Sequence, residues 1–271
     1  MKDIDGQKPP LSTAEWSGLL SLATAALLFF VDARLSLIPL TVFLLLCISA
    51  PFFPRFGFYL PIISRGNSGK RAVAITFDDG PDPLTTPHLL RLLLEHRVKA
   101  VFFVTGKNAA ENPELINAIL EQGHAIGNHS YSHNTLVLFK SCQGIIKEIK
   151  AAQNVLGEFG VRPLAFRPPA GITNPRLRPA LLNCGVYLVN FSCRAFDGGN
   201  RWIENLSGRI LKRVRPDDII LLHDSRPKYE NTIPQWLNEI ELLLSGLKSR
   251  GLTVLPLSEI IGKPVQVKTD L

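Results

Sequence analysis

Residues 72–81 read A-V-A-I-T-F-D-D-G-P, and this stretch decides how the rest of the chain is interpreted. Residues 72–77 are apolar or β-prone and predict a buried strand, while Gly80 and Pro81 predict a turn directly after it. Asp78 and Asp79 therefore lie where a strand ends and a loop begins. In parallel α/β barrels the loops at these strand ends form the active site. Acidic residues are also common in turns without any function, so the pair alone decides nothing.

Six further apolar runs follow along the chain, and helix-like segments separate them. The expected strands are residues 72–77, 100–105, 125–128, 165–167, 187–192, 218–223 and 253–257. Asn112 and Pro113 predict the start of one intervening helix, and Gly123 predicts its end. Strands that alternate with helices predict a parallel sheet, and seven of them favour closure into a barrel. No G-x-G-x-x-G follows the first strand, which disfavours a dinucleotide-binding fold.

The N-terminal region carries two long uncharged runs. Residues 16–31 and 35–54 contain sixteen and twenty residues without a charge, with one short charged break between them. About 20 apolar residues are needed to cross a hydrocarbon core of ~30 Å, so the second run is long enough and the first is slightly short. We expect an N-terminal transmembrane helical hairpin that contacts membrane lipid and anchors the chain in a bacterial-type inner or plasma membrane. The alternative is a buried helical pair of a soluble domain.

The residues around these runs suggest an orientation and a domain boundary. Basic residues flank the pair of runs on both sides, whereas the connecting loop has only Arg34. This asymmetry favours a cytoplasmic position for the segments on both sides of the hairpin, and so for the rest of the chain. If only the second run crosses the membrane, the rest of the chain could lie outside, so its side of the membrane stays open. The Gly- and Ser-containing stretch 64–70 is expected to be a short linker. The chain is therefore divided into residues 1–65, anchor and linker, and residues 66–271, a second domain.

Charge and cysteine content exclude some classes of function. The formal net charge of +7 divides into +3 for residues 1–71, which hold seven basic and four acidic residues, and +4 for the remainder. No block of Lys and Arg is interleaved with aromatic residues, so we expect no nucleic-acid partner. The four cysteines, Cys47, Cys142, Cys184 and Cys193, contain no C-x-x-C pair. This pattern indicates neither a zinc knuckle nor a disulfide framework.

Three more of the expected strands also run into polar residues. Residues 127–133 read G-N-H-S-Y-S-H, and the i, i+4 spacing of His129 and His133 predicts one face of a helical turn. With an Asp from another strand end, they complete a His-His-Asp set, which is typical of a catalytic metal site with open coordination positions. Arg167, in F-R-P-P-A-G, could orient a carboxylate. The strand I-L-L-H-D ends at His223 and Asp224.

The elements T-F-D-D-G, H-S-x-x-H, R-P-P and L-x-H-D, in this order between about residues 70 and 260, resemble the polysaccharide deacetylase family, the NodB-homology carbohydrate esterases of family 4. The resemblance implies a distorted (β/α) barrel. It also implies a metal-dependent hydrolase that removes an N-acetyl or other N-acyl group from an amino sugar in a glycan or a lipid-linked saccharide. One divalent metal ion is implied, with Zn²⁺ expected, although cobalt, nickel or manganese suit the same ligands.

The resemblance also implies roles for the residues at the first two motifs and for the arginine. Asp79, His129 and His133 would bind the metal ion. Asp78 would be the general base, and Arg167 would hold it in place.

The remaining roles fall on the later motifs. His223 would be the general acid, and Asp197 would tune it. Leu221 would line the pocket for the acyl methyl group, and the backbone N–H of Ala170 would contact the oxyanion.

Two departures from the family pattern affect the substrate groove and the surroundings of the acid. Ala170 stands where the family usually has Tyr. In the element that is usually D-x-x-D-W, Asp197 is present, Asn200 replaces the second Asp and Trp202 is displaced. Two other readings remain: a non-catalytic carbohydrate-binding module on a degenerate site, and a C–N hydrolase of a non-sugar amide.

Overall fold

The structure is a computed structural model of the 271-residue chain and describes residues 10–136 and 140–269. Its main sheet follows the order β6-β5-β3-β2-β1-β8-β7, with β9 beside β1, and all its pairings are parallel. The seven expected strands are all present. The strands are β1 (Ala72–Asp78), β2 (Val101–Val104), β3 (Ala125–Asn128), β5 (Ala165–Phe166), β6 (Tyr187–Leu188), β7 (Cys193–Arg194), β8 (Ile219–His223) and β9 (Thr253–Val254). A separate antiparallel pair joins β4 (Val161–Pro163) to β10 (Gln266–Lys268).

The sheet curls into an incomplete barrel. Its first and last strands in spatial order, β6 and β7, are separated in the chain by residues 189–192 only. The same stretch of chain therefore borders β5 at one edge and β8 at the other. The main-chain N–H of Val189 donates to Phe166 O at 2.9 Å, and that of Ser192 donates to Ile219 O at 3.1 Å. This closure agrees with the expected distorted barrel.

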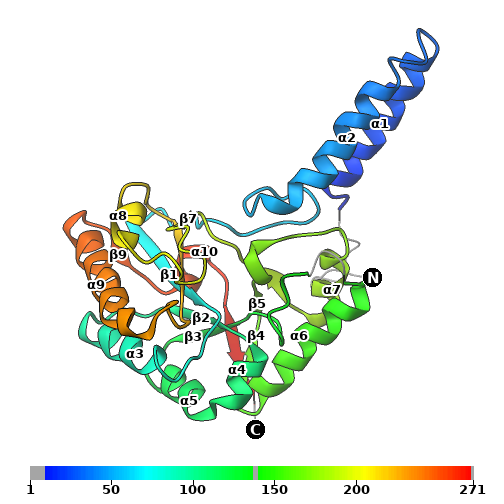
Figure 1. The fold of residues 1–271 in the computed structure, drawn as a ribbon. Helices are drawn as coiled ribbons and strands as arrows, with labels where there is room; N and C mark the ends of the chain where they lie inside the picture. Colours follow the sequence, from blue (N-terminus) through cyan, green and yellow to red (C-terminus); the bar gives the residue numbers. More distant parts are fainter. Residues whose placement is uncertain (1–9, 137–139, 270–271) are drawn as a thin grey trace.

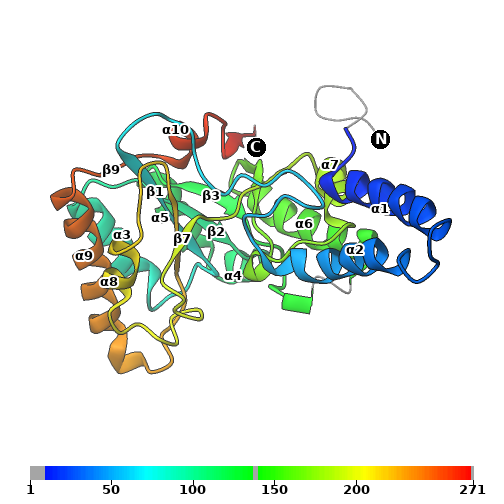
Figure 2. The same ribbon diagram turned by 90° about the horizontal axis from the view of Figure 1, so that it is seen from above.

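The period of two along each strand separates an outer core from an inner one. Val73, Ile75 and Phe77 of β1 pack in the outer core. This core lies beneath the helices α3 (Thr86–Glu95), α5 (Pro113–Glu121), α8 (Leu206–Leu211) and α9 (Ile233–Ser249), which flank the sheet in Figures 1 and 2. Ala72 and Ala74 point the other way, into the inner core. Side chains two residues further on therefore also point into the barrel.

Four further helices and three short turns also pack around the barrel. They are α4 (Gly106–Glu111), α6 (Cys142–Gly157), α7 (Leu177–Cys184) and α10 (Leu257–Ile261), with the 3-10 turns η1 (Ala50–Phe52), η3 (Pro169–Gly171) and η4 (Glu230–Thr232). The predicted helix start at Pro113 is confirmed, and Gly123 follows that helix with φ of 75°, a conformation that suits glycine. α6 and α7 enclose a third apolar cluster that also includes Phe58 and Tyr59.

Two N-terminal helices form a hairpin that projects from the barrel, as Figure 1 shows. They are α1 (Thr13–Phe29) and α2 (Leu37–Ser49), and the Ser21 hydroxyl donates to Pro39 O at 2.8 Å between them. Ser12 and Glu15 form a capping box at the start of α1. Phe58 O accepts the N–H of Ala14 at 2.8 Å, which ties the base of the hairpin to the barrel side.

The prediction of a transmembrane hairpin and of a membrane location is corrected by the structure. Within residues 10–136 and 140–269, no helix is both long and apolar enough to cross a membrane. The 17 residues of α1 and the 13 of α2 correspond to about 26 and 20 Å at 1.5 Å per residue, against a core of ~30 Å. The second run of twenty uncharged residues is longer than the 13-residue α2 because turns take up its ends. Pro51 lies in the 3-10 turn η1, which follows α2 directly.

The stretch expected to be a linker lies against the barrel. Ile63 forms a parallel bridge with Val189, and Arg65 forms an antiparallel bridge with Asp218. The N–H of Gly66 then donates to Asp217 O at 2.8 Å. The chain thus passes through the region where residues 189–192 change neighbour from β5 to β8.

Candidate active site

The polar residues at the ends of β1 and β8 lie side by side inside the barrel. Asp78 is paired in register with His223, so the two side chains leave adjacent strands at the same level. Thr76 and Asp78 continue the inward phase of Ala72 and Ala74, and His223 continues that of Leu221. Strand periodicity alone therefore directs the Asp78 and His223 side chains to one point.

The turn after Asp78 reverses direction and exposes the next carboxylate. Asp79 has φ of 77°, and its carbonyl oxygen accepts a hydrogen bond from Asn108 Nδ2 at 2.7 Å. A Cβ on Gly80 would come within 2.5 Å of Asp224 Oδ2, so only glycine fits there. Asp224 in turn accepts hydrogen bonds from the hydroxyls of Thr85 and Thr86 and is fully buried. Burial raises the pKa of Asp224 to about 7, although both hydroxyls oppose the rise.

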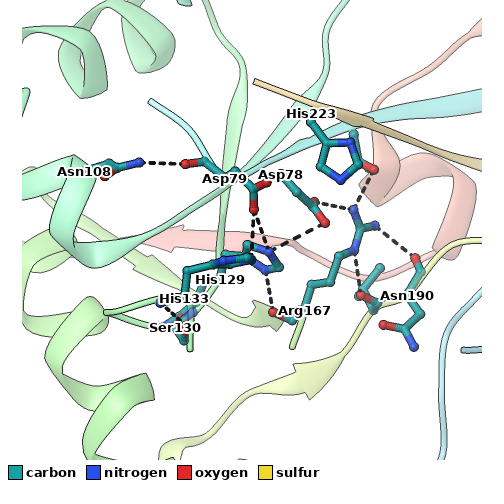
Figure 3. Close-up of polar contacts among 12 residues, drawn as sticks. Asp78, Asp79, Asn108, His129, Ser130, His133, Arg167, Asn190 and His223 are labelled. Atoms are coloured by element: carbon teal, nitrogen blue, oxygen red, sulfur yellow. Dashed lines mark hydrogen bonds and ion pairs between the residues drawn. The ribbon is translucent and has the colours of Figure 1, made fainter. Parts of the chain in front are cut away.

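Three side chains converge on a single point beside this turn, as Figure 3 shows. Asp79 Oδ1 lies 3.4 Å from His129 Nε2 and 3.0 Å from His133 Nε2. The ligand atoms of these three residues all lie within 4.8 Å of one another. His129 Nδ1 donates to Arg167 O at 2.7 Å, which leaves the lone pair of Nε2 facing Asp79. Two imidazole nitrogens and a carboxylate oxygen suit a divalent cation.

The two histidines do not lie on a helical turn, so that expectation was wrong. Residues 129–133 form a loop in which Ser130 and His133 have φ of 66° and 52°. The Ser130 hydroxyl accepts the N–H of His133 at 3.2 Å, and Asn128 Oδ1 accepts the N–H of Ser130 at 2.9 Å. This loop brings the two imidazole rings to a centroid distance of 4.9 Å.

The charges of this group stabilise one another. Burial opposes ionisation of Asp79, but the neighbouring His129 and His133 imidazoles lower the pKa of its carboxyl well below the usual value. Burial likewise disfavours a charge on His133, yet its bond to Asp79 raises the pKa of the imidazole. The site is therefore built around a firmly ionised carboxylate.

Arg167 lies beneath the site rather than in its cleft, with 0% of the residue exposed. Its Nη1 donates to Asp78 Oδ1 at 2.6 Å and to Thr76 Oγ1 at 2.8 Å. Its Nε and Nη2 donate to the carbonyl oxygens of Val189 and Asn190 at 3.1 and 3.0 Å. The guanidinium also stacks 4.0 Å from the centre of the Phe103 ring. Burial lowers the pKa of Arg167, while Asp78 opposes this.

Removal of the Arg167 charge is expected to destabilise the fold. Arg167→Met would leave the buried Asp78 carboxylate without its cation and lower the free energy of unfolding by about 3–5 kcal/mol. Chemical denaturation measures this change. Arg226→Met is the matched control, because Arg226 donates to Asp82 Oδ2 at 2.8 Å but is half-exposed, and its loss should cost at most about 1 kcal/mol. Equal losses in the two variants would contradict the role given to burial.

His223, which is partly buried, and Asp197, which is buried, form a pair on the opposite side of the site. His223 Nδ1 donates to Asp197 Oδ2 at 2.8 Å. Burial lowers the pKa of His223, but the bond to Asp197 outweighs it and raises the pKa to about 9. Burial raises the pKa of Asp197, and the bond to His223 reverses this and lowers it. Asn200, which stands where the family usually has Asp, donates to His223 O at 2.9 Å and to Ser225 O at 2.7 Å.

Eight of the nine predicted site residues line one cleft of about 460 Å³, with Arg167 beneath it. Leu221 points into it from β8, and Ala170 lies at its edge with φ of 58°. Sequence reasoning missed Phe191, Arg194 and Phe196, which also line the cleft. No motif marks them, although Phe191 lies within the expected strand 187–192 and Arg194 and Phe196 follow shortly after its end.

Comparison with known proteins gives a consistent result. The sequence profile described as polysaccharide deacetylase matches residues 65–189. A chitooligosaccharide deacetylase of Sinorhizobium fredii is 33% identical over 72% of this chain and 94% of its own length. A peptidoglycan-N-acetylglucosamine deacetylase of Bacillus cereus is 31% identical over 72% and 90%. The crystal structure of a peptidoglycan N-acetylglucosamine deacetylase with a bound N-oxidanyl-benzamide is 29% identical, with a TM-score of 0.68 over 75% of this chain and 94% of that one.

Proposed function

Because the chain belongs to the polysaccharide deacetylase family, we propose that it hydrolyses the N-acetyl, or another N-acyl, group of an amino sugar. The observation that carries this proposal is the placement of Asp78, His223 and the Asp79–His129–His133 group around one cleft. The relatives named above are deacetylases of chitooligosaccharides and of peptidoglycan N-acetylglucosamine. A saccharide that carries N-acetylglucosamine is therefore the first substrate to test.

The metal ion would be held by Asp79, His129 and His133, and we propose Zn²⁺. The donor set fits, since Asp79 is firmly ionised and the His129 tautomer leaves Nε2 free. A bound divalent ion would supply a Lewis acid that polarises the acyl carbonyl and acidifies water.

Asp78 is proposed as the general base. Its Oδ1 is engaged by Arg167, whereas Oδ2 lies 3.8 Å from His129 Nε2, close to the metal position. Oδ2 would accept the proton of the attacking water as its oxygen bonds to the acyl carbon. The bond from Arg167 fixes the orientation of the carboxylate.

His223 is proposed as the general acid. Its Nδ1 is bound to Asp197, so Nε2 would donate a proton to the sugar nitrogen as the C–N bond breaks. The products are a carboxylate and a free amine. The N–H of Ala170 would donate to the developing oxyanion, and Leu221 would contact the acyl methyl group.

The pH dependence of the reaction is expected to report His223. A general acid must be protonated, so kcat should fall on the alkaline side with a midpoint at or slightly below 9, because a bound cation nearby favours the neutral imidazole. Asp197→Asn removes the negative charge that raises this pKa and should move the alkaline limb down by at least about one pH unit. The pH profile of kcat measures this shift.

The control for this shift is Asp32→Asn, which changes a carboxylate in the exposed hairpin loop. It should leave the alkaline limb in place. An unchanged limb in Asp197→Asn would show that the group titrating near pH 9 is not His223.

The proposed function is tested by incubating the zinc-loaded full chain with N-acetylglucosamine oligosaccharides and measuring released acetate together with new primary amines. Stoichiometric appearance of both is expected. Absence of both, across neutral and charged N-acyl amino sugars, would overturn the assignment.

A further inference from the structure

A second, larger cleft lies directly beside the catalytic one. It measures about 700 Å³, and Phe191, Arg194 and Phe196 line both clefts. Arg194 is paired in register with Leu221, the residue proposed to contact the acyl group. A ligand bound at Leu221 would therefore reach this second cleft along β7.

The second cleft is strongly basic. Among the described residues that line it, one is acidic, Asp218, and six are cationic: Arg55, Arg65, Arg194, Lys212, Arg213 and Arg215. They come from four separate parts of the chain, namely the segment after η1, the stretch before β1, β7 and the segment after α8. The fold, and not a local run of charge, gathers them.

Asp218 does not neutralise this cluster. Its Oδ1 accepts the Ser192 hydroxyl at 2.7 Å, and its Oδ2 accepts the main-chain N–H of Arg215 at 2.7 Å. Arg65 Nε lies 3.6 Å from it. Within residues 10–136 and 140–269, none of the other five cations lies within 4.0 Å of a carboxylate. Among the described residues, five positive charges thus line this cleft without an ion pair to a carboxylate.

Aromatic rings fix part of this cluster in place. The guanidinium of Arg194 lies 4.2 Å from the Phe196 ring centre, and that of Arg213 lies 5.6 Å from the same ring. Phe196 is 54% exposed and has φ of 58°, an unfavourable conformation for a bulky residue. The strained, exposed ring thus holds two cations at the junction of the clefts, which reduces the entropy they would lose on binding an anion.

We propose that this basic cleft binds a phosphoryl group of the substrate, so that the acylated amino sugar is recognised as a glycosyl phosphate or diphosphate. The inference rests on the proposed function, since it places the sugar in the catalytic cleft and the anion beside it. Several guanidinium groups suit phosphate oxygens, which accept paired hydrogen bonds from arginine. The phosphoryl group could belong to a soluble sugar nucleotide or to a lipid-linked saccharide, because both offer the same chemistry.

The first test measures the binding of inorganic pyrophosphate to the zinc-loaded full chain by calorimetry at 0.15 M salt. Arg55→Gln/Arg213→Gln is expected to raise Kd about tenfold or more, in line with the loss of two charged hydrogen-bond donors. Both side chains are exposed, so the fold should tolerate the changes. Arg91→Gln on α3 is the matched control and should leave Kd unchanged. An equal Kd in the double variant would overturn the proposal.

The second test compares substrates. We compare the KM of three phosphorylated substrates with the KM of neutral N,N′-diacetylchitobiose. The three are N-acetylglucosamine 1-phosphate, UDP-N-acetylglucosamine and, in detergent, a polyprenyl-diphosphate-linked N-acetylglucosamine. A KM at least about tenfold lower for any phosphorylated compound, lost in the double variant, supports the proposal, and the preferred compound identifies the source of the phosphate. Hydrolysis of the neutral sugar with equal or lower KM would overturn it while leaving the proposed function intact. Hydrolysis of none would overturn the proposed function.

Discussion

Replacing Asp78 with asparagine is expected to lower kcat about 10³-fold, because the amide cannot accept the proton of the attacking water. The three proposed metal ligands remain, so zinc content should stay at one ion per chain. Some loss of stability is also expected, since Arg167 loses the charge of its buried partner. Acetate release, elemental analysis and thermal unfolding of the same sample separate these effects.

Two further variants sharpen the Asp78 experiment. Asp78→Glu keeps the charge beside Arg167 but moves the carboxylate by one methylene, so activity should fall while stability changes less than in Asp78→Asn. Asp82→Asn alters a carboxylate four residues further on that is bound to Arg226, and it should retain activity. If Asp78→Asn kept its metal and nearly all its activity, Asp78 would not be the base.

Loss of a metal ligand is expected to have a comparable effect by a different route. Asp79→Ala and His133→Ala should each lose the bound ion and reduce kcat about 10³-fold or more, because several kcal/mol of transition-state stabilisation disappear. A chelator should do the same to the unaltered protein and also lower its Tm, since the ion binds only the folded state. Added Zn²⁺ should restore both in the unaltered protein and neither in the variants.

The control for the metal experiment is His88→Ala, which removes an exposed histidine on α3. Metal content and activity should not change. Full activity of the chelated protein, with no ion detected, would show that the Asp79–His129–His133 group has another role.

The strands and their polar ends could be predicted from the sequence because both depend on local pattern. An apolar run such as residues 72–77 predicts a buried strand, and the first charged residue after it, Asp78, shows where the strand ends. Each polar strand end is then brought to the same edge by the parallel sheet. The register between Asp78 and His223 follows from that geometry, although no local pattern states it.

Other features depended on tertiary structure and could not be predicted. Counting uncharged residues in 35–54 overestimated the length of the second helix, because turns and Pro51 occupy the ends of that run. The i, i+4 spacing of His129 and His133 suggested a helix, but main-chain hydrogen bonds accepted by the Ser130 hydroxyl and by Asn128 Oδ1 fix a loop instead. The basic cleft could not be predicted from the sequence because its cations are distributed over residues 55–215 and come together only in the folded chain.

The bridges of Ile63 and Arg65 have a practical consequence for where the protein can be shortened. These two residues form a short bridging segment between Val189 and Asp218, beside residues 189–192, where the chain passes from β5 to β8. A truncation that begins at residue 66 would remove this bridging segment. It would expose main-chain hydrogen-bonding groups of the neighbouring strands, and such exposed groups favour intermolecular strand pairing. A truncation that begins before Ile63 would keep this bridging segment. We therefore expect a stable truncated protein to begin upstream of Gly66 and Gly69, although these glycines mark the domain boundary expected from the sequence.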